Sequence, residues 1–271
     1  MDPILEIQNL CKRYGDHVAV DDISFSVPRG SVFGLLGPNG AGKTTTIRMI
    51  MRIIAADSGT VLLDGQPVDD DRRRVIGYLP EERGLYKKMK VLEHLVYLGT
   101  IRGLRPGEAK KRAAAWLERF ELGEWSTHKV EDLSKGMQQK IQLIGTILHR
   151  PPLLILDEPF SGLDPINTRE LKNLMLQMAE EGVTIVLSTH VLPQVDELCS
   201  DICLINRARP ILLGPLDRIR DDYGGNTWRV SSDLPDGELA ALPGVTSIHP
   251  LGEEKLLEME DGREPRDLLR A

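Results

Sequence analysis

The apolar stretch Val32-Phe33-Gly34-Leu35-Leu36 leads directly into Gly37-Pro38-Asn39-Gly40-Ala41-Gly42-Lys43-Thr44. Nearly continuous apolar character is typical of a strand that is covered on both faces of a parallel sheet. The second stretch matches G-x-x-x-x-G-K-[ST] in full, and a helix is expected from Thr45. Small residues let successive backbone N–H groups turn inward, and the helix N-terminus adds positive potential. The succession therefore predicts a phosphate-binding loop in an α/β fold.

Two later segments, residues 153–156 and 184–187, are similarly apolar and predict two more strands with both faces buried. Helical patterns fill the gaps between these strands, so we expect an α/β fold with a mixed or parallel sheet core. Near the N-terminus, residues 5–10 and 23–27 alternate between apolar and polar side chains, and residues 61–63 follow a turn. These three segments predict a small antiparallel β layer.

Residues from about 87 to 149 carry apolar side chains every three or four positions, which is the spacing of buried helix faces. The stripes comprise Val91, Leu92, His94, Leu95 and Leu98, then Ala113, Trp116, Leu117 and Phe120, then Met137, Ile141, Ile144 and Leu148. We interpret these side chains as core. The pattern predicts a helical subdomain within a nucleotide-binding domain of residues 1–220.

The sequence pattern changes after Pro215. Residues 226–231 and 255–260 have strand character, and residues 236–242 form a short helical pattern between them. We therefore place a domain boundary near Asp221 and predict a small α+β accessory domain over residues 221–271.

The composition limits the possible functions. A net charge of −7 and a pI near 5.5 argue against a nucleic-acid-binding surface. Cys11, Cys199 and Cys203 have neither disulfide nor zinc-site spacing, so we expect core thiols in a reduced cytosolic compartment. No apolar run approaches the ~18–20 residues that span a bilayer, and the N-terminus has no signal pattern. We expect a soluble chain, so any membrane role would depend on another chain.

Two parts of the sequence supply nucleotide chemistry. Lys43 is placed to reach the β- and γ-phosphates, and the Thr44 hydroxyl can ligate Mg²⁺. Asp157 emerges from the end of a buried strand, where its carboxylate can hold Mg²⁺ directly or through water. Glu158 is then placed to orient or deprotonate the attacking water. The expected ATP-binding residues of the loop are Gly37, Pro38, Asn39, Gly40, Ala41, Gly42, Lys43, Thr44 and Thr45.

A second motif, Leu133-Ser134-Lys135-Gly136-Met137, stands at the head of a helix and begins 24 residues before Asp157. It resembles the signature motif of ATP-binding cassette (ABC) ATPases, which closes over the ATP held by a second copy. The resemblance therefore implies a partner cassette, which we expect to be a second copy of this chain. Lys135 and Met137 depart from the common form Leu-Ser-Gly-Gly-Gln, and Lys135 could attract ATP or point into solvent. Ser134 can still cap the helix and donate to phosphate, and Gly136 still permits close backbone approach.

The resemblance extends to three further places. Tyr14, 23 residues before Gly37, resembles the aromatic residue that stacks on adenine. Ser161-Gly162-Leu163-Asp164 resembles the D-loop, which lies across the seam of the dimer. His190 follows the last buried strand and resembles the switch histidine that contacts the γ-phosphate. With Glu158, it makes up the expected catalytic pair.

A further departure concerns metal binding. Ile76-Gly77-Tyr78-Leu79-Pro80-Glu81 resembles the segment leading into the Q-loop, but Glu81 stands where most members have Gln. The carboxylate could ligate Mg²⁺ with Thr44 and Asp157, or it could face water, and Glu82 could serve equally well. The stretch Pro80-Glu81-Glu82-Arg83-Gly84-Leu85-Tyr86 is similar to cassettes of ABC-2-type exporters, including the sodium-export (Nat-like) group.

Taken together, the resemblance covers residues 5–216 and implies an ATP- and Mg²⁺-dependent hydrolase that powers a membrane exporter. Two copies would hold two ATP molecules between them. Residues 87–149 would contact an integral membrane permease, which would hold the cytoplasmic chain at the inner face of the cell membrane. The alternative is an ABC ATPase without a transport role, such as an iron–sulfur assembly factor. A small-molecule P-loop kinase is a weaker alternative because it leaves the signature motif and His190 unexplained.

Overall fold

The structure is a computed structural model that describes residues 2–82, 84–223, 227–232, 234–251 and 254–260. The chain divides into two compact units, Met1–Leu216 and Asp217–Ala271.

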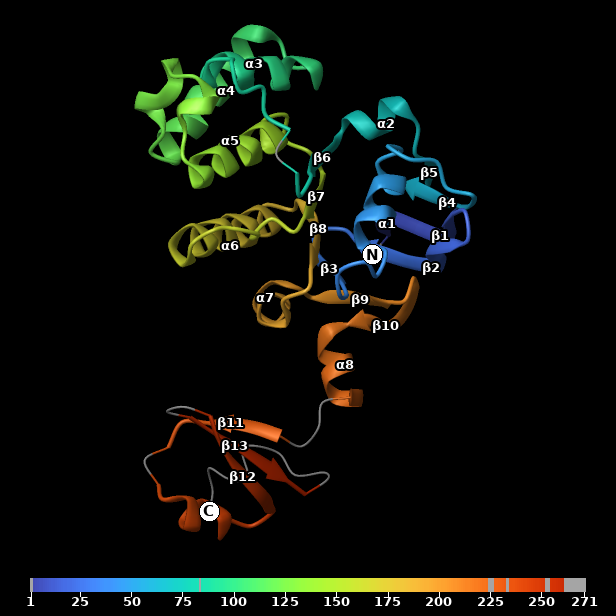
Figure 1. Cartoon of the computed structure of the whole chain (residues 1–271), viewed down its shortest axis with the longest axis vertical. Helices are drawn as coiled ribbons and strands as arrows, with labels where there is room; N and C mark the ends of the chain where they lie inside the picture. Colours follow the sequence, from blue (N-terminus) through green and yellow to red (C-terminus); the bar gives the residue numbers. More distant parts are fainter. Residues whose placement is uncertain (1, 83, 224–226, 233, 252–253, 261–271) are drawn as a thin grey trace. The chain divides into compact units, whose positions relative to one another are not determined.

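The first unit is centred on a six-stranded sheet (Figure 1). Its strands are β3 (Val32–Leu36), β6 (Ile76–Leu79), β7 (Leu153–Asp157), β8 (Thr184–Thr189), β9 (Asp201–Asn206) and β10 (Arg209–Pro215). They follow the order β10-β9-β3-β8-β7-β6, and neighbouring strands are parallel except β9 and β10. Every residue of β3, β7 and β8 is buried, which accounts for their apolar sequences. Parallel pairing brings the carboxyl ends of these three strands to one edge of the sheet.

A second, antiparallel sheet lies beside the first, in the order β2-β1-β4-β5. Its strands are β1 (Pro3–Tyr14), β2 (His17–Pro28), β4 (Ser58–Leu63) and β5 (Gln66–Pro67). The rings of Phe25 in β2 and Phe33 in β3 stack with centroids 5.0 Å apart and join the two sheets into one core. Helix α1 (Lys43–Ile50) follows β3 and buries Ile47, Met49 and Ile50 in the same core. It begins two residues before the expected start at Thr45.

Helices make up the rest of the first unit. They are α2 (Asp70–Arg74), α3 (Val91–Ile101), α4 (Pro106–Arg119), α5 (Lys135–Ile147), α6 (Pro165–Glu180) and α7 (Leu192–Leu198), with 3-10 turns η1 (Gly123–Thr127) and η2 (Val130–Asp132). In Figure 1, α3, α4 and α5 form one group, the helical region expected over residues 87–149. Gly145 lets α5 approach α3 closely, because a Cβ there would lie 2.4 Å from Leu98 Cδ1. The chain thus has the α/β fold expected from its sequence.

The second unit begins with α8 (Leu216–Tyr223), of which all residues but Leu216 belong to it. It contains β11 (Thr227–Val230), α9 (Asp236–Ala240), β12 (Val245–Leu251) and β13 (Glu254–Met259), with antiparallel strands in the order β11-β13-β12. The predicted boundary near Asp221 falls inside α8, and β12 was missing from the sequence prediction. Asn226 and Glu260 lay within predicted strands; Asn226 is outside the described residues, and Glu260 follows the end of β13.

Candidate nucleotide-binding site

A cavity of about 320 Å³ opens above the carboxyl end of β3 and the N-terminus of α1. It is lined by Tyr14, His17, Ala19, Asn39, Gly40, Ala41, Gly42, Lys43, Thr44, Thr45, Glu81 and Glu158. The sequence predicted most of these residues but missed His17 and Ala19. His17 pairs with Tyr14 across the turn between β1 and β2. Its nearness to Tyr14 in the sequence was therefore the signal that could have indicated it.

The phosphate-binding loop has a backbone that only glycine adopts readily at two positions. Gly37 and Gly42 have φ angles of 149° and 112°. A Cβ at Gly37 would lie 2.2 Å from the Ile205 carbonyl oxygen, and one at Gly42 would lie 2.4 Å from that of Ala19. The loop is therefore pressed against β9 and β2 as well as curled on itself. Its curvature directs the start of α1 at the cavity.

Lys43 is buried and turns back over its own loop. Its Nζ donates to the carbonyl oxygen of Gly37 at 2.7 Å and to that of Pro38 at 3.3 Å. The same nitrogen lies 3.4 Å from Glu158 Oε1. Gly37 and Pro38 do not line the cavity themselves, so their contribution is to hold the Lys43 side chain through these two hydrogen bonds. The ammonium group stands at the centre of the loop, where an anionic ligand would meet it.

Asp157 ends β7 and has two carboxylate oxygens in different situations. Oδ1 accepts from Ser188 Oγ at 2.5 Å and from Thr44 Oγ1 at 3.3 Å. Oδ2 is buried and has no hydrogen-bond partner among the residues that the structure describes. Burial raises the pKa of this carboxyl above its ordinary value, against the opposing effect of the Ser188 and Thr44 hydrogen bonds. An orphaned carboxylate oxygen beside a threonine hydroxyl fits a hard divalent cation such as Mg²⁺.

Glu158 follows at a sharp turn with φ of 48°, in the left-handed region. Its backbone N–H donates to Ser188 Oγ at 3.0 Å, and its Oε1 lies 2.9 Å from His190 Nδ1. His190 is half-exposed, whereas the Glu158 side chain is only 11% exposed. The turn therefore brings Glu158 back into the cavity between Lys43 and His190. A carboxylate held in this way can accept a proton from water.

The remaining predicted residues of this site lie at the rim. Tyr14 is half-exposed, with Lys12 Nζ 5.5 Å from its ring centroid, so the ring is open to a stacking partner. Glu81 lines the cavity, whereas Glu82 is exposed and its Oε1 lies 3.7 Å from an Arg48 guanidinium nitrogen. The two neighbouring glutamates thus face different surroundings.

Gln142 of α5 holds the segment that carries these glutamates. Its Nε2 donates to the carbonyl oxygens of Pro80 and Glu82, both at 3.2 Å. The backbone on either side of Glu81 is therefore tied to the helical region.

The signature and D-loop residues lie elsewhere on the chain. Ser134 caps α5 by accepting from the Met137 N–H at 3.3 Å, and Asp164 caps α6 by accepting from the Asn167 N–H at 2.9 Å. Neither motif contributes to the lining of the cavity. A Cβ on Gly136 would lie 3.4 Å from Asn167 Nδ2, so the two motifs are neighbours. The single chain thus brings the signature and D-loop together and leaves both apart from the phosphate-binding loop.

Other metal sites receive no support. Within the residues that the structure describes, no group of three or more His, Cys, Asp or Glu side chains could hold a metal ion. Burial raises the pKa of both the Cys199 and the Cys203 thiol to about 12, so these side chains are core thiols. A divalent cation at Asp157 would therefore need oxygens from the nucleotide and water.

Comparison with known proteins identifies the family. Residues 20–161 match the sequence profile of the family described as ABC transporter. The chain belongs to this ABC transporter ATP-binding family.

Relatives of this ABC cassette extend the match to most of its length. It is 46% identical to an uncharacterized ABC transporter ATP-binding protein, YhaQ, of Bacillus subtilis, over 85% of this chain and 77% of the relative. It is 35% identical to the Nod factor export ATP-binding protein I of Cupriavidus metallidurans, over 100% of this chain and 90% of the relative. A solved ATP-binding subunit of an ABC transporter superposes with a TM-score of 0.76 at 34% identity, over 82% of this chain and 93% of that one.

The family and the site agree on the reaction. The ABC cassette is an ATP hydrolase, as its family and its cassette fold show. Within the described residues, no helix combines the length and the apolar content needed to cross a membrane.

Proposed function

We propose that this ABC cassette powers a membrane exporter by cycles of ATP-driven dimerisation and hydrolysis. The observation that carries the proposal is the division of the motifs over the chain. Residues 39–44 of the phosphate-binding loop and Glu158 line one cavity, and Asp157 is hydrogen-bonded to Thr44 at its edge. Ser134 and the D-loop do not contribute to this lining. In this proposal each chain has one nucleotide site that it does not complete by itself, and one signature motif and D-loop that lie outside that site. Two copies arranged head to tail would complete both sites.

At each site the loop and its neighbours would divide the work. Tyr14 would stack on adenine, and Lys43 would exchange its contacts with Gly37 and Pro38 for the nucleotide phosphates. The Ser134 hydroxyl of the second copy would donate a hydrogen bond to the γ-phosphate, next to the N-terminus of α5. The phosphates would then be enclosed by fixed N–H and hydroxyl donors, with little water.

Glu158 would act on the attacking water. Its carboxylate contacts both Lys43 and His190. When Lys43 turns to the phosphates, one of these contacts is given up and Glu158 can accept a proton. His190 remains beside Glu158 Oε1 and is placed to donate to the γ-phosphate.

Thr44, Asp157 and Glu81 would hold Mg²⁺, which neutralises charge on the phosphates when bound. The fit rests on the buried, unpartnered Asp157 Oδ2 and on Thr44 Oγ1 beside it. The role of this chain is to keep Asp157 in place, and Ser188 does so from the adjacent strand β8.

Several observations support the transport role. A relative that matches the whole chain is named for Nod factor export, and no observation favours an assembly role without transport. The exporter would need a separate permease, which would hold this chain at the inner face of the membrane. ABC-2-type permeases are the class that the Pro80–Tyr86 resemblance favours. The export cargo would be selected by that permease.

The test is Glu158→Gln, which keeps the shape of the side chain but removes the proton acceptor. We expect ATP to bind normally and hydrolysis to fall at least ~100-fold, with accumulation of an ATP-bound dimer. Steady-state phosphate release and size-exclusion chromatography with ATP measure both effects. The exposed Glu180→Gln is the matched control. Hydrolysis within about threefold of wild type would contradict the role given to Glu158.

A further inference from the structure

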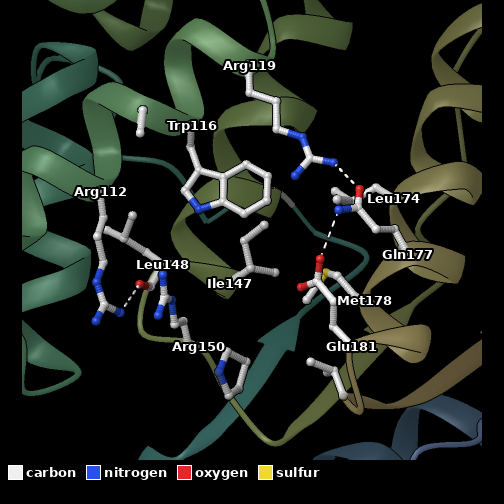
Figure 2. A pocket seen from close by; sticks show the side chains of 13 residues that line it. Arg112, Trp116, Arg119, Ile147, Leu148, Arg150, Leu174, Gln177, Met178 and Glu181 are labelled. Carbon is white, nitrogen blue, oxygen red and sulfur yellow. Dashed lines mark hydrogen bonds between the residues drawn. The ribbon is translucent and has the colours of Figure 1, made fainter.

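Away from the nucleotide site, a cavity of about 650 Å³ lies between α4, the end of α5 and α6 (Figure 2). Its walls and floor are mainly apolar and consist of Ala115, Trp116, Ile147, Leu148, Pro151, Leu174, Met178 and Val183. Five polar side chains complete the lining, namely Arg112, Arg119, Arg150, Gln177 and Glu181. An apolar cavity of this volume with a few polar groups has the size and character of a small-molecule site.

The indole of Trp116 dominates one wall. Figure 2 shows it projecting from α4 into the cavity, with Ile147 below it and the α6 side chains opposite. The Arg119 guanidinium lies 4.9 Å from the indole and donates to Gln177 Oε1 on α6. Gln177 Nε2 in turn donates to Glu181 Oε1 at 2.9 Å. The α4 and α6 walls are thus joined on one side by a polar chain, and the indole is part of the cavity lining.

The three arginines are not equivalent. Arg112 donates to the Leu148 carbonyl oxygen at 3.0 Å and pairs with Glu108, so the end of α5 accounts for it. Arg119 is accounted for by Gln177 and Trp116. Arg150 is exposed and has no ion-pair partner among the residues that the structure describes. Arg150 follows the end of α5, has a φ of 57° and lies at the edge of the cavity.

The charges of the lining favour an anion. The lining contains three arginines and one carboxylate, that of Glu181, and Arg112 is already paired with Glu108 outside the lining. Glu181 already accepts from Gln177, on the wall that carries Arg119. Arg150 is therefore the cation left for a ligand.

We propose that this cavity binds a small amphipathic organic anion. Its aromatic or aliphatic body would pack on Trp116, Ile147 and Met178, and its carboxylate, sulfonate or phosphate would pair with Arg150. Such a ligand would contact α4 and α6 together. Because α5 begins at the Ser134 cap and α6 at the Asp164 cap, the ligand touches the far ends of both helices that carry those motifs.

The probe for the test is anilinonaphthalene sulfonate, an aromatic sulfonate that fluoresces in apolar surroundings. It is titrated into the full chain with saturating ADP, so that the nucleotide cavity is occupied. We expect saturable binding of one probe per chain and a rise in the thermal unfolding midpoint. Trp116→Phe keeps an aromatic wall but removes the nearest energy donor. Probe emission excited through tryptophan should therefore fall, whereas emission excited directly persists.

Two substitutions locate the ligand. Arg150→Glu should weaken probe binding at least about tenfold, because it removes one charge-assisted contact and adds repulsion. Arg105→Glu is the control, since it makes the same charge change at an exposed position outside the cavity. Ala115→Phe fills the cavity from its exposed α4 edge and should abolish saturable binding without lowering the unfolding midpoint.

Equal affinity in wild type, Arg150→Glu and Ala115→Phe would overturn the proposal. Non-saturable binding in the wild type, or an equal loss in Arg105→Glu, would overturn it as well. The first result would place the probe elsewhere, and the others would leave only general hydrophobic or charge effects.

Discussion

At the scale of single residues, Ser188 connects the Asp157 carboxylate with the backbone of Glu158. Its hydroxyl donates to Asp157 Oδ1 and accepts from the Glu158 N–H. The sequence pattern could indicate both acidic residues, because an apolar run ending in Asp-Glu is informative by itself. It could not indicate Ser188, because that position depends on the pairing of Asp157 with Ser188 across β7 and β8.

Asp157→Asn should separate stability from function. The raised pKa of Asp157 means that the folded chain binds its proton more tightly than the unfolded chain does. Wild-type stability is therefore penalised as the pH rises above the unfolded value of about 3.8, and the penalty vanishes at lower pH. We expect the unfolding free energy of the variant, relative to wild type, to be higher at pH 7 than at pH 4. Urea titrations at both pH values measure this difference, and ATP hydrolysis should be lost. A constant difference would contradict the prediction.

Glu81→Gln tests which glutamate serves the metal. Glu81 lines the nucleotide cavity, whereas Glu82 is directed to Arg48. An anionic ligand favours a hard cation, so the amide should raise the Mg²⁺ concentration for half-maximal hydrolysis several-fold while ATP affinity without metal is unchanged. Glu82→Gln is the control and should superimpose on wild type. A shift confined to Glu82→Gln would move the role by one residue.

At the scale of elements, α3 carries a buried histidine whose ring nitrogens form no hydrogen bond within the described part of the chain. This residue, His94, is fully buried, and burial lowers its pKa to about 4. The apolar stripe of α3 predicted its inward direction from sequence. Its proton affinity could not be predicted, because that depends on what surrounds the ring.

His94→Leu should make the helical region less sensitive to acid. A lowered histidine pKa means that protonation favours the unfolded chain, so stability is lost as the pH falls from about 6.5 towards 4. At pH 5 this loss is about 1–2 kcal/mol, and the variant should not show it. Denaturant unfolding at pH 7 and pH 5 measures the difference. Equal acid losses in variant and wild type would count against it.

Elements were predictable to the extent that burial imposed a regular pattern. The continuous apolar runs of β3, β7 and β8 and the helical stripes of α3 to α5 follow from what each face contacts. β12 did not follow, because its residues are mostly exposed or half-buried and include His249 and Pro250. The position of Tyr14 beside the phosphate-binding loop required the packing of β1 and β2 against β3, which local patterns do not encode.

At the scale of the whole molecule, the proposed dimer rests on where the motifs lie in one chain. The caps at Ser134 and Asp164 are near each other and apart from the nucleotide cavity of the same chain. Sequence alone could predict both motifs. It could not show that one chain separates them, since this depends on how the helical region is attached to the sheet.

Ser134→Arg should therefore leave nucleotide binding to one copy intact and abolish ATP-driven dimerisation. A bulky cation at a close phosphate contact would hold the second copy away, and turnover should fall at least ~100-fold. Calorimetry measures binding, and light scattering measures dimerisation. Thr127→Arg adds the same charge at an exposed position in the helical region and should behave as wild type. Loss of ATP binding in the single copy would show that Ser134 acts within its own chain.

Through the two hydrogen bonds from Gln142 to Pro80 and Glu82, α5 would take part in both nucleotide sites of the proposed dimer. One part of this helix is tied to the edge of its own nucleotide cavity, and in the proposed dimer its first turn would contact the nucleotide of the second copy. In the proposed dimer, a displacement of the Glu81 segment would pull on the helix that closes the opposite site. Each copy would then respond to the hydrolysis state of both nucleotides through the movement of α5 as a rigid body. ATP hydrolysis at the two sites would consequently be correlated, and no additional ligand would be needed to couple them.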